Sequence, residues 1–151
     1  MKILGFDLGD GESAVTLLDE DSTVEPRVMP LCGKNSLISA VGVKDGRIVI
    51  GEAASVTDGA AEAKVRFKSR YLTDPAASAD VRAFAQGVMN ELVRTQPALM
   101  AEVSRTVVGC PAGWGDGRRE QYAALLESAG FPNVSVVPEP RAAFLLSLIH
   151  I

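Results

Sequence analysis

The sequence is poor in the residues that build metal centres and disulfide frameworks. Its 151 residues include one histidine and two cysteines. Cys32 and Cys110 lack the spacing of metal ligands, and a single histidine cannot complete a set, so a structural zinc site is excluded. We expect both thiols to be reduced and partly buried.

Long apolar runs and an excess of basic residues are also absent. No apolar run approaches the length of a membrane span, and the four-residue run after Lys2 is far shorter than a secretory signal core. A formal net charge of −4 argues against nucleic acid as the main partner, because duplex binding relies on a basic surface. At 47% hydrophobic and 23% charged, the chain can bury one core of ordinary size. We therefore expect a cytoplasmic globular protein with neither nucleic acid nor a membrane as partner.

The N-terminal segment predicts a β-hairpin with an acidic, glycine-rich loop. Apolar runs over residues 3–6 and 14–18 flank the loop, which begins at Asp7 and contains Gly9 and Gly11. Glycine lets backbone amides approach an anion, so such a loop can hold phosphate. The Asp7 carboxylate, at the end of a buried strand, suits a hydrated magnesium ion. From these residues alone, an ordinary tight hairpin with a solvated tip is the favoured interpretation.

Further strands alternate with helices and indicate an α/β fold. A strand over residues 24–31 contains two prolines, which favours an edge position. Strands over 37–43 and 47–50 flank a hairpin turn at residues 44–46. Those over 105–110 and 134–137 should run parallel to each other, joined by a right-handed crossover. The spacing alone supports a mixed sheet with helices.

Two helices are predicted between these strands. An apolar stripe over residues 81–92 indicates one, capped by Ser78 or Asp80 and ended near Pro97. The second covers residues 116–129, with Asp116 as cap and Gly130 at its end. Residues 51–78 are rich in small residues and predict a small helical or irregular subdomain.

Four motifs, in the correct order, resemble the heat shock protein 70 (DnaK-type) chaperone family. Residues 7–13, DLGDGES, resemble the family's first phosphate loop, D-L-G-T-T-N-S. Residues 48–53, IVIGEA, resemble its V-x-x-G-x-x-A, and Phe67-Lys68 resembles the context of its essential lysine. Residues 106–143 resemble its strand–helix–strand–helix segment, with PEPRAA at 138–143 in place of N-E-P-T-A-A. The resemblance covers nearly the whole chain.

The resemblance implies a fold and its division into parts. The fold would be the ribonuclease-H-like fold of the actin and heat-shock ATPases, an α/β fold with a mixed five-stranded sheet and a small inserted subdomain. Residues 1–31 and 101–145 would form the sheet of an incomplete first lobe. Residues 32–100 would form the inserted subdomain, and residues 146–151 a non-native tail.

The resemblance also implies cofactors, partners and site residues. ATP and Mg²⁺ would be the cofactors of the full-length parent, with unfolded polypeptides and co-chaperones as partners. Lys68 would stabilise charge on the transferring γ-phosphoryl group and its attacking water. Catalytic roles also fall to Asp7 and Glu139, which would hold magnesium through water. The remaining implied residues are Gly9, Asp10, Gly11 and Glu12 for phosphate binding, and Pro111 and Arg119 for relaying nucleotide state to a neighbouring domain.

Each of these residues has a simpler explanation when the resemblance is set aside. Glu139 would be an exposed residue favoured near a helix N-terminus by the helix dipole. Lys68 belongs to four basic residues at alternate positions from 64 to 70, which share one side only if the segment is extended. Pro111 would simply end a strand, and Arg119 would be a solvated residue of the first helical turn.

Two departures from the family pattern indicate a divergent relative. Asp10 and Gly11 stand where the family has two threonines. A carboxylate beside a polyphosphate should weaken binding unless magnesium or a basic group offsets the repulsion. Gly113 and Trp114 replace a tyrosine and a phenylalanine, which changes the packing expected there.

The family's second phosphate hairpin, adenine loop and second lobe have no counterpart in this sequence. Because catalysis clamps the transferring group from both sides, we expect no appreciable ATP hydrolysis by this chain alone. Residues 146–151, LSLIHI, match the translation of a transposase sequencing adapter, so we interpret them as an artefact, with a natural helix end as the alternative. Missing covering helices would leave an exposed apolar patch.

The sequence thus favours the N-terminal lobe of an ATP-binding heat shock protein 70-like chaperone, a protein-folding ATPase. Two alternatives stay open. One is another member of the superfamily, either sugar-kinase-like or filament-forming. The other is a non-catalytic interaction module on the same fold.

Overall fold

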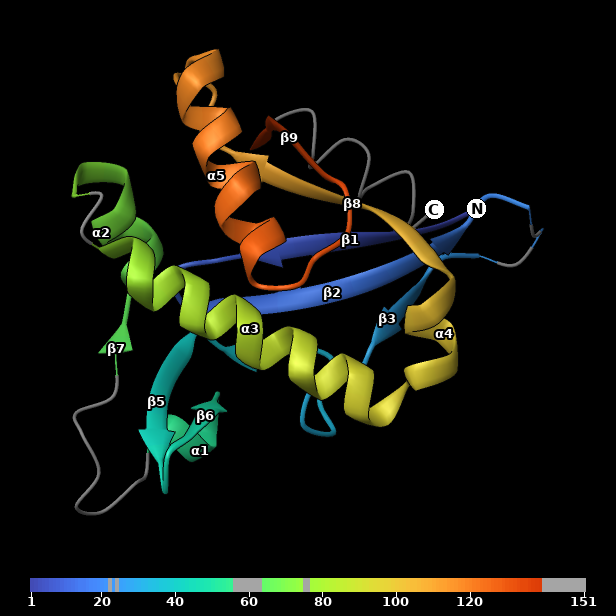
Figure 1. The fold of residues 1–151 in the computed structure, drawn as a ribbon, viewed down its shortest axis with the longest axis horizontal. Coiled ribbons are helices and arrows are strands. Elements are labelled where there is room, and N and C mark those ends of the chain that lie inside the picture. Colours follow the sequence, from blue (N-terminus) through green and yellow to red (C-terminus); the bar gives the residue numbers. More distant parts are fainter. Residues whose placement is uncertain (22, 24, 56–63, 75–76, 140–151) are drawn as a thin grey trace.

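A mixed sheet forms the centre of the molecule (Figure 1). The computed structural model describes residues 1–21, 23, 25–55, 64–74 and 77–139. Five of its strands follow the order β3-β2-β1-β8-β9: β1 (Lys2–Leu8), β2 (Glu12–Asp19), β3 (Arg27–Met29), β8 (Val103–Cys110) and β9 (Val134–Pro138). A sixth strand, β4 (Leu37–Ile38), also pairs with β2, so the sheet has one strand more than predicted. β2 is antiparallel to β1 and β3, whereas β8 is parallel to β1 and β9 is parallel to β8. This confirms the predicted mixed sheet, the edge position of β3 and the parallel pair.

A second sheet of three strands lies beside the first. It contains β5 (Ala40–Lys44), β6 (Arg47–Ile50) and β7 (Lys64–Val65) in the order β6-β5-β7, followed in the chain after β6 by α1 (Glu52–Ser55). Asp45 and Gly46 make the β5–β6 turn, both with positive φ (52° and 77°), as a tight two-residue hairpin requires. The predicted hairpin is confirmed.

The single strand predicted over residues 37–43 is wrong, because the segment divides between the two sheets. Leu37–Ile38 form β4, which pairs with β2 in the main sheet, and β5 begins only at Ala40. The break falls at Ser39, whose amide donates to the Gly11 carbonyl at 2.9 Å. A polar residue bonded to the loop backbone therefore ends one strand before the next begins.

Helix α3 (Ser78–Thr95) crosses the main sheet and reaches the second one (Figure 1). Its predicted apolar stripe is buried throughout, at Val81, Phe84, Ala85, Val88 and Leu92. Helix α5 (Asp116–Ser128) packs near β9 and α3. Gly130, with a φ of 111°, follows α5 and confirms the predicted stop.

The predicted helix caps are wrong in both helices. Ala77 precedes α3, so Ser78 is already helical, and no side chain caps this end. Gly115 precedes α5, and Asp116 instead forms an ion pair with Arg119 one turn on, at 2.8 Å. Pro97 does more than end α3, because it opens the short helix α4 (Pro97–Glu102), where its missing N–H has no cost.

Residues 51–78 contain more regular structure than predicted. Besides α1 and β7, helix α2 (Phe67–Thr73) lies within this range and packs against α3. Phe67 is fully buried, with its ring centroid 5.1 Å from that of Phe84. Because Lys68 and Arg70 are helical and Lys64 lies in a strand, the alternate basic residues do not form one extended cationic row.

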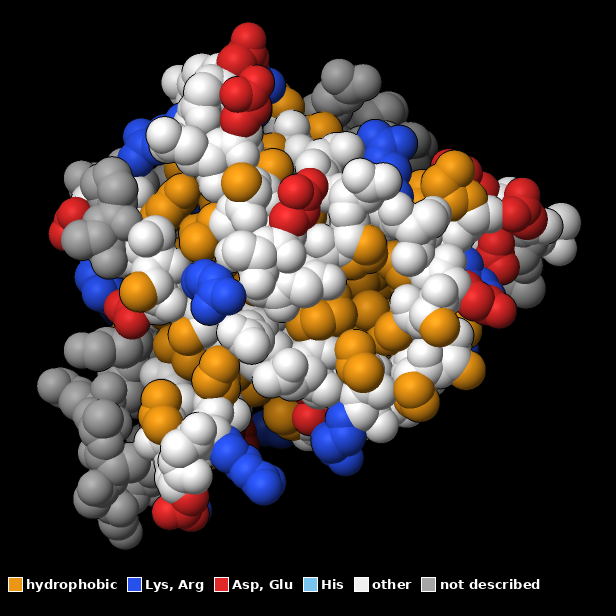
Figure 2. Space-filling model, viewed as in Figure 1, with side chains coloured by type: hydrophobic (Ala, Val, Ile, Leu, Met, Phe, Trp, Pro, Cys, Tyr) orange, Lys and Arg blue, Asp and Glu red, His pale blue; other side chains and the backbone are white. Residues whose placement is uncertain are grey.

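One hydrophobic cluster connects the two sheets through α3. Gly87 lets this helix approach β6 closely, because a Cβ there would collide with Ile50 and lie 3.0 Å from the Ile48 side chain. Charged side chains of both signs are spread around the rim of this face, and apolar side chains show between α5 and α4 (Figure 2). The proposed division into 1–31 with 101–145, and 32–100, stays a prediction.

The two thiols differ more than predicted. Cys110 is buried, with 1% of its surface exposed, but Cys32 is exposed, so the expectation of two partly buried thiols was wrong for Cys32. Cys32 and Gly33 have positive φ in a turn closed by two hydrogen bonds between Leu31 and Lys34, which pushes Cys32 outward. No helix in the described part of the chain is long and apolar enough to span a bilayer. The predicted tail at 146–151 lies outside the described residues.

Candidate functional site

Lys68 and Glu139 meet in the folded chain, although 71 positions separate them in the sequence. The Lys68 Nζ donates to the Glu139 Oε1 at 2.8 Å. Lys68 is the second residue of α2, and Glu139 directly follows β9. The Lys68 side chain is 16% exposed and that of Glu139 is 51% exposed. A pair so open to water adds little to stability, so its importance is that it brings two predicted site residues together.

The loop between β1 and β2 contacts the helix that carries Lys68. Asp10 Oδ1 accepts a hydrogen bond from the Ser69 amide at 3.2 Å. Ser69 is the third residue of α2, and Arg66, which precedes the helix, provides no side-chain cap. Asp10 therefore satisfies one of the first-turn amides that a helix leaves without internal partners. The carboxylate expected to repel a polyphosphate is engaged by the protein itself.

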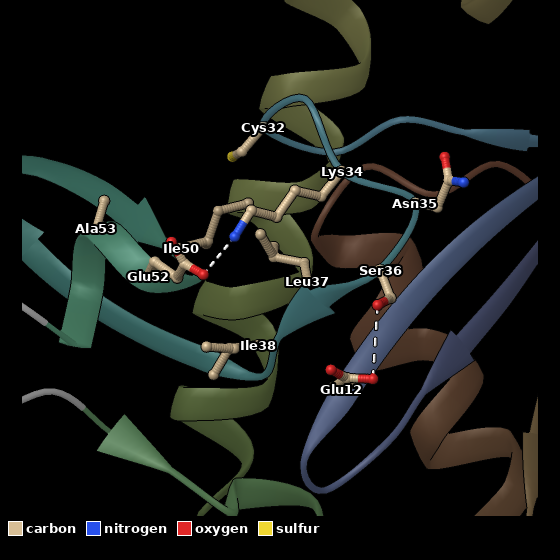
Figure 3. Close-up of a pocket in the computed structure, with 10 residues that line it drawn as sticks. All are labelled: Glu12, Cys32, Lys34, Asn35, Ser36, Leu37, Ile38, Ile50, Glu52 and Ala53. Carbon is tan, nitrogen blue, oxygen red and sulfur yellow. Dashed lines mark hydrogen bonds and ion pairs between the residues drawn. The ribbon is translucent and has the colours of Figure 1, made fainter.

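The second carboxylate of the loop faces another part of the molecule. Glu12 Oε2 accepts from the Ser36 hydroxyl at 3.5 Å, at the edge of a groove of about 360 Å³ (Figure 3). An ion pair between Lys34 and Glu52 spans this groove. Of the predicted phosphate-binding residues, Asp10 thus contacts α2, whereas Glu12 contacts the segment before β4.

The backbone of Gly9 is held by two buried serines. Its amide donates to the Ser13 hydroxyl at 3.3 Å, and its carbonyl accepts from the Ser39 hydroxyl at 2.7 Å. The two hydroxyls lie 2.8 Å apart, and each serine is 1% exposed. A Cβ at Gly9 would collide with the Glu12 carbonyl oxygen, so no larger residue fits this turn unchanged. Sequence reasoning missed Ser39; the only signal is a polar residue within an apolar run.

Asp7 and Glu139 both act electrostatically on Tyr122, a buried tyrosine of α5. Burial raises the pKa of Tyr122, and smaller contributions in the same direction come from Tyr71, Cys110, Glu139 and Asp7. Asp7 itself is exposed, on the face of β1 opposite Phe6 and Leu8. Both predicted magnesium-binding carboxylates therefore favour the protonated form of this one phenol.

Cys110, at the end of β8, has predicted site residues of both charges around it. Burial raises the pKa of its thiol, Glu139 adds to this effect, and Arg119 and Lys68 oppose it. The carboxyl ends of the parallel strands β1, β8 and β9 lie at one edge of the sheet, with Asp7 near the end of β1 and Glu139, which bonds to Lys68, directly after β9. Ligands of α/β proteins bind at the carboxyl ends of parallel strands, and this is such an edge.

A cluster of three aromatic rings attaches α2 to α5. The ring centroids of Tyr71, Trp114 and Tyr122 lie 5.3–5.9 Å from one another. Arg118 stacks 4.9 Å from the Trp114 ring centroid and also donates to the Tyr71 carbonyl at 3.2 Å. Trp114 is 8% exposed. The tryptophan that departs from the family pattern is therefore buried, and its ring helps to join α2 to α5. Sequence reasoning did not find this cluster.

The two predicted relay residues make local contacts. Pro111 follows β8, and its carbonyl accepts from the Trp114 amide at 3.2 Å. Arg119 pairs with Asp116 within the first turn of α5. Their relay role stays a prediction.

The acidic side chains of the candidate site suit a metal ion that keeps most of its waters better than one coordinated directly by several side chains. Among the residues that the structure describes, no three histidine, cysteine or acidic side chains gather closely enough to bind a metal directly. Mg²⁺ usually keeps several waters and uses one or two carboxylates with phosphate oxygens. The magnesium role predicted for Asp7 and Glu139, through water, is of this limited kind and stays a prediction.

The chain is similar to a DnaK chaperone. The chaperone protein DnaK of Thermosipho melanesiensis is 27% identical over 154 residues, which cover 95% of this chain and 25% of that protein. This chain therefore spans about a quarter of the length of the curated relative it matches. No protein-family model matches it. The similarity supports a heat shock protein 70-like relationship, and the α/β architecture is compatible with the fold of that family's ATPase domain.

Proposed function

We propose that this chain is the N-terminal lobe of the ATPase domain of a heat shock protein 70-like chaperone. The observation that supports this most directly is the contact between Lys68 and Glu139, next to the β1–β2 loop. A lysine and a glutamate from distant motifs, brought to one glycine-rich loop, are the parts that phosphoryl-transfer sites combine.

In this proposal each group has a distinct task. The backbone amides of Asp10 and Gly11 donate to phosphate oxygens at the tip of the loop. Asp7 and Glu139 would hold a bound Mg²⁺ through its waters, and the ion would supply positive charge to neutralise phosphate. The Lys68 ammonium, bonded to Glu139 in this structure, would stabilise negative charge on a bound γ-phosphoryl group.

The wider role follows from the similarity to DnaK. The complete protein would use ATP to bind and release unfolded polypeptides, with co-chaperones as partners and the cytoplasm as its location. Pro111 and Arg119 would relay nucleotide state from the end of β8 and the start of α5. ATP-dependent release of an unfolded peptide by the full-length gene product would separate a chaperone from a sugar kinase or a filament-forming relative.

Nucleotide binding by the purified chain tests the proposal directly. The ¹⁵N-labelled chain is titrated with Mg-ADP, and backbone amide shifts are followed by NMR. We expect the Asp10, Gly11 and Lys68 amides to shift together, and Lys68→Ala to weaken the response. Arg82→Ala is the control, because Arg82 lies on α3 and bonds to Ser128 on α5. Absence of any shift in the loop would refute nucleotide binding and favour the non-catalytic interaction module.

A further inference from the structure

The hydroxyls of Ser13 and Ser39 form a ring of hydrogen bonds with the Gly9 backbone. Ser39 has one hydroxyl hydrogen, and the Gly9 carbonyl, 2.7 Å away, takes it. Ser39 Oγ must therefore accept from Ser13, 2.8 Å away. Ser13 Oγ in turn accepts from the Gly9 amide at 3.3 Å. The direction of every hydrogen bond in the ring is thus fixed, and such closed chains strengthen one another.

This ring decides which loop amides can meet a ligand. Both polar backbone groups of Gly9 are occupied by the serines, so its amide is not a phosphate donor. The Ser39 amide also holds the Gly11 carbonyl, at 2.9 Å. Within the part of the chain that the structure describes, the amides of Asp10 and Gly11 donate no hydrogen bond. The serines hold the Gly9 backbone and the Gly11 carbonyl in place. The N–H groups of Asp10 and Gly11 are then the loop amides that can donate to a phosphate.

We propose that Ser39, acting with Ser13, is a positioning residue that holds the β1–β2 loop in its phosphate-binding conformation. This inference rests on the proposed function. Ser39 lies between β4 of the main sheet and β5 of the second sheet. The connection between the two sheets therefore supplies a side chain that sets the geometry of the β1–β2 loop. A change in the position of β5 would alter phosphate affinity through this hydroxyl.

Two measurements on the 151-residue chain test the role of Ser39. The first is hydrogen exchange of the Gly9 amide, without nucleotide. Ser39→Ala should accelerate this exchange, because the Ser13 hydroxyl loses the acceptor that orients it. The second is the NMR titration with Mg-ADP, in which Ser39→Ala should raise Kd roughly 2- to 10-fold, the equivalent of about one hydrogen bond. Ser104→Ala is the matched control, because Ser104 is exposed and lies on β8.

The double variant Ser13→Ala/Ser39→Ala tests whether the two serines act on Kd together or independently. Each single change leaves the other serine with an unpaired group, so the Kd effects of the two changes should combine to less than their product. Should Ser39→Ala fail to fold, Ser39→Cys is used, since it keeps the shape of the site and is a poor donor. Ser39→Cys should also raise the Kd for Mg-ADP.

The outcomes separate this inference from the proposed function. If the unchanged chain gives no loop shifts with Mg-ADP, the proposed function fails and the positioning role fails with it. If the unchanged chain binds Mg-ADP and Ser39→Ala binds as tightly as Ser104→Ala, the positioning role is overturned and the proposed function stands. Unchanged Gly9 exchange in Ser39→Ala would also overturn it.

Discussion

Asp10 accepts a hydrogen bond from the Ser69 amide, 59 positions away, and so joins the β1–β2 loop to the helix that carries Lys68. On its other side this helix is attached to α5 by the contact between the Tyr71 and Tyr122 rings, which are tilted by 35° to each other. Lys68 is thus held between two parts of the chain that the sequence places far apart. An acidic residue at position 10 serves this arrangement, although it departs from the family pattern.

Replacing Asp10 should destabilise the chain through the loss of this cap. Asp10→Ala should lower the free energy of unfolding by about 1 kcal/mol, as loss of a capping side chain typically does. Asp10→Asn keeps an oxygen that can accept from Ser69 and should cost less. Urea unfolding followed by circular dichroism measures both. Glu20→Ala, at an exposed site outside the loop, serves as the control, and a loss as large as that of Asp10→Ala there would contradict the capping role.

Removing the Tyr122 hydroxyl should stabilise the protein. Among the described residues, the hydroxyl is buried without a hydrogen-bond partner, and such a group carries the cost of its lost hydration. Tyr122→Phe should therefore raise the free energy of unfolding by about 1 kcal/mol. Tyr71→Phe is the matched control and should give no such gain. A destabilised Tyr122→Phe variant would show that the hydroxyl has a partner in solution.

The same variant should change how stability depends on alkaline pH. Burial raises the pKa of Tyr122 above its ordinary value of about 10. The unfolded chain therefore loses this proton first, and the contribution of Tyr122 is intact below pH ~10 and declines above it, by at most about 1.4 kcal/mol per pH unit. Burial also raises the pKa values of Tyr71 and Cys110. Their contributions to stability therefore decline with rising pH in the unchanged chain and in Tyr122→Phe alike. Thermal unfolding from pH 8 to 11 should thus show a growing advantage of Tyr122→Phe.

Gly87→Ala should destabilise the protein, although helix propensity alone would predict that alanine stabilises α3. Alanine is favoured over glycine by about 1 kcal/mol within a helix. Here, however, the new Cβ would collide with Ile50 of β6, and overpacking of a core typically costs about 1–3 kcal/mol. Asn90→Ala, at an exposed site on the same helix, should be neutral or stabilising. Equal stability changes for the two variants in urea would show that α3 can move away from β6.

Only one thiol should react in the native protein. Cys32 is exposed and Cys110 is buried. Burial raises the pKa of both thiols, so access of the reagent to the sulfur distinguishes the two. A thiol reagent such as DTNB should modify one group per native chain and two in denaturant. Cys32→Ser should leave no reactive group in the native state. Rapid modification of that variant would show that the end of β8 opens.

ATP turnover by this chain should not exceed that of its Lys68→Ala variant. Two of the candidate groups, Asp7 and Glu139, are exposed to solvent, and Glu139 is 51% exposed. Phosphoryl transfer requires the reacting groups to be held in place and water to be excluded. Phosphate release from Mg-ATP is the measurement. Turnover by the unchanged chain that is lost in Lys68→Ala would contradict this expectation.

The sequence by itself determined the elements whose patterns are local. The apolar period of residues 81–92 gave the buried face of α3, and Gly130 gave the end of α5, because helix period and glycine stops act over a few residues. The hairpin at Asp45 and Gly46 was equally local. The helix caps were predicted wrongly, since several polar residues near a helix start can each fill that position.

Tertiary structure alone decided which distant groups meet. Nothing local to Asp10 shows that its carboxylate reaches Ser69, and nothing local to Ser39 shows that its hydroxyl holds Gly9. Trp114 became an anchor only because α2 brings Tyr71 against it. Motif resemblance selected Lys68 and Glu139 separately, whereas their 2.8 Å contact required the sheet order that places the end of β9 near α2. Such contacts depend on how the whole chain packs, because long-range pairing is set by the shared core and not by neighbouring residues.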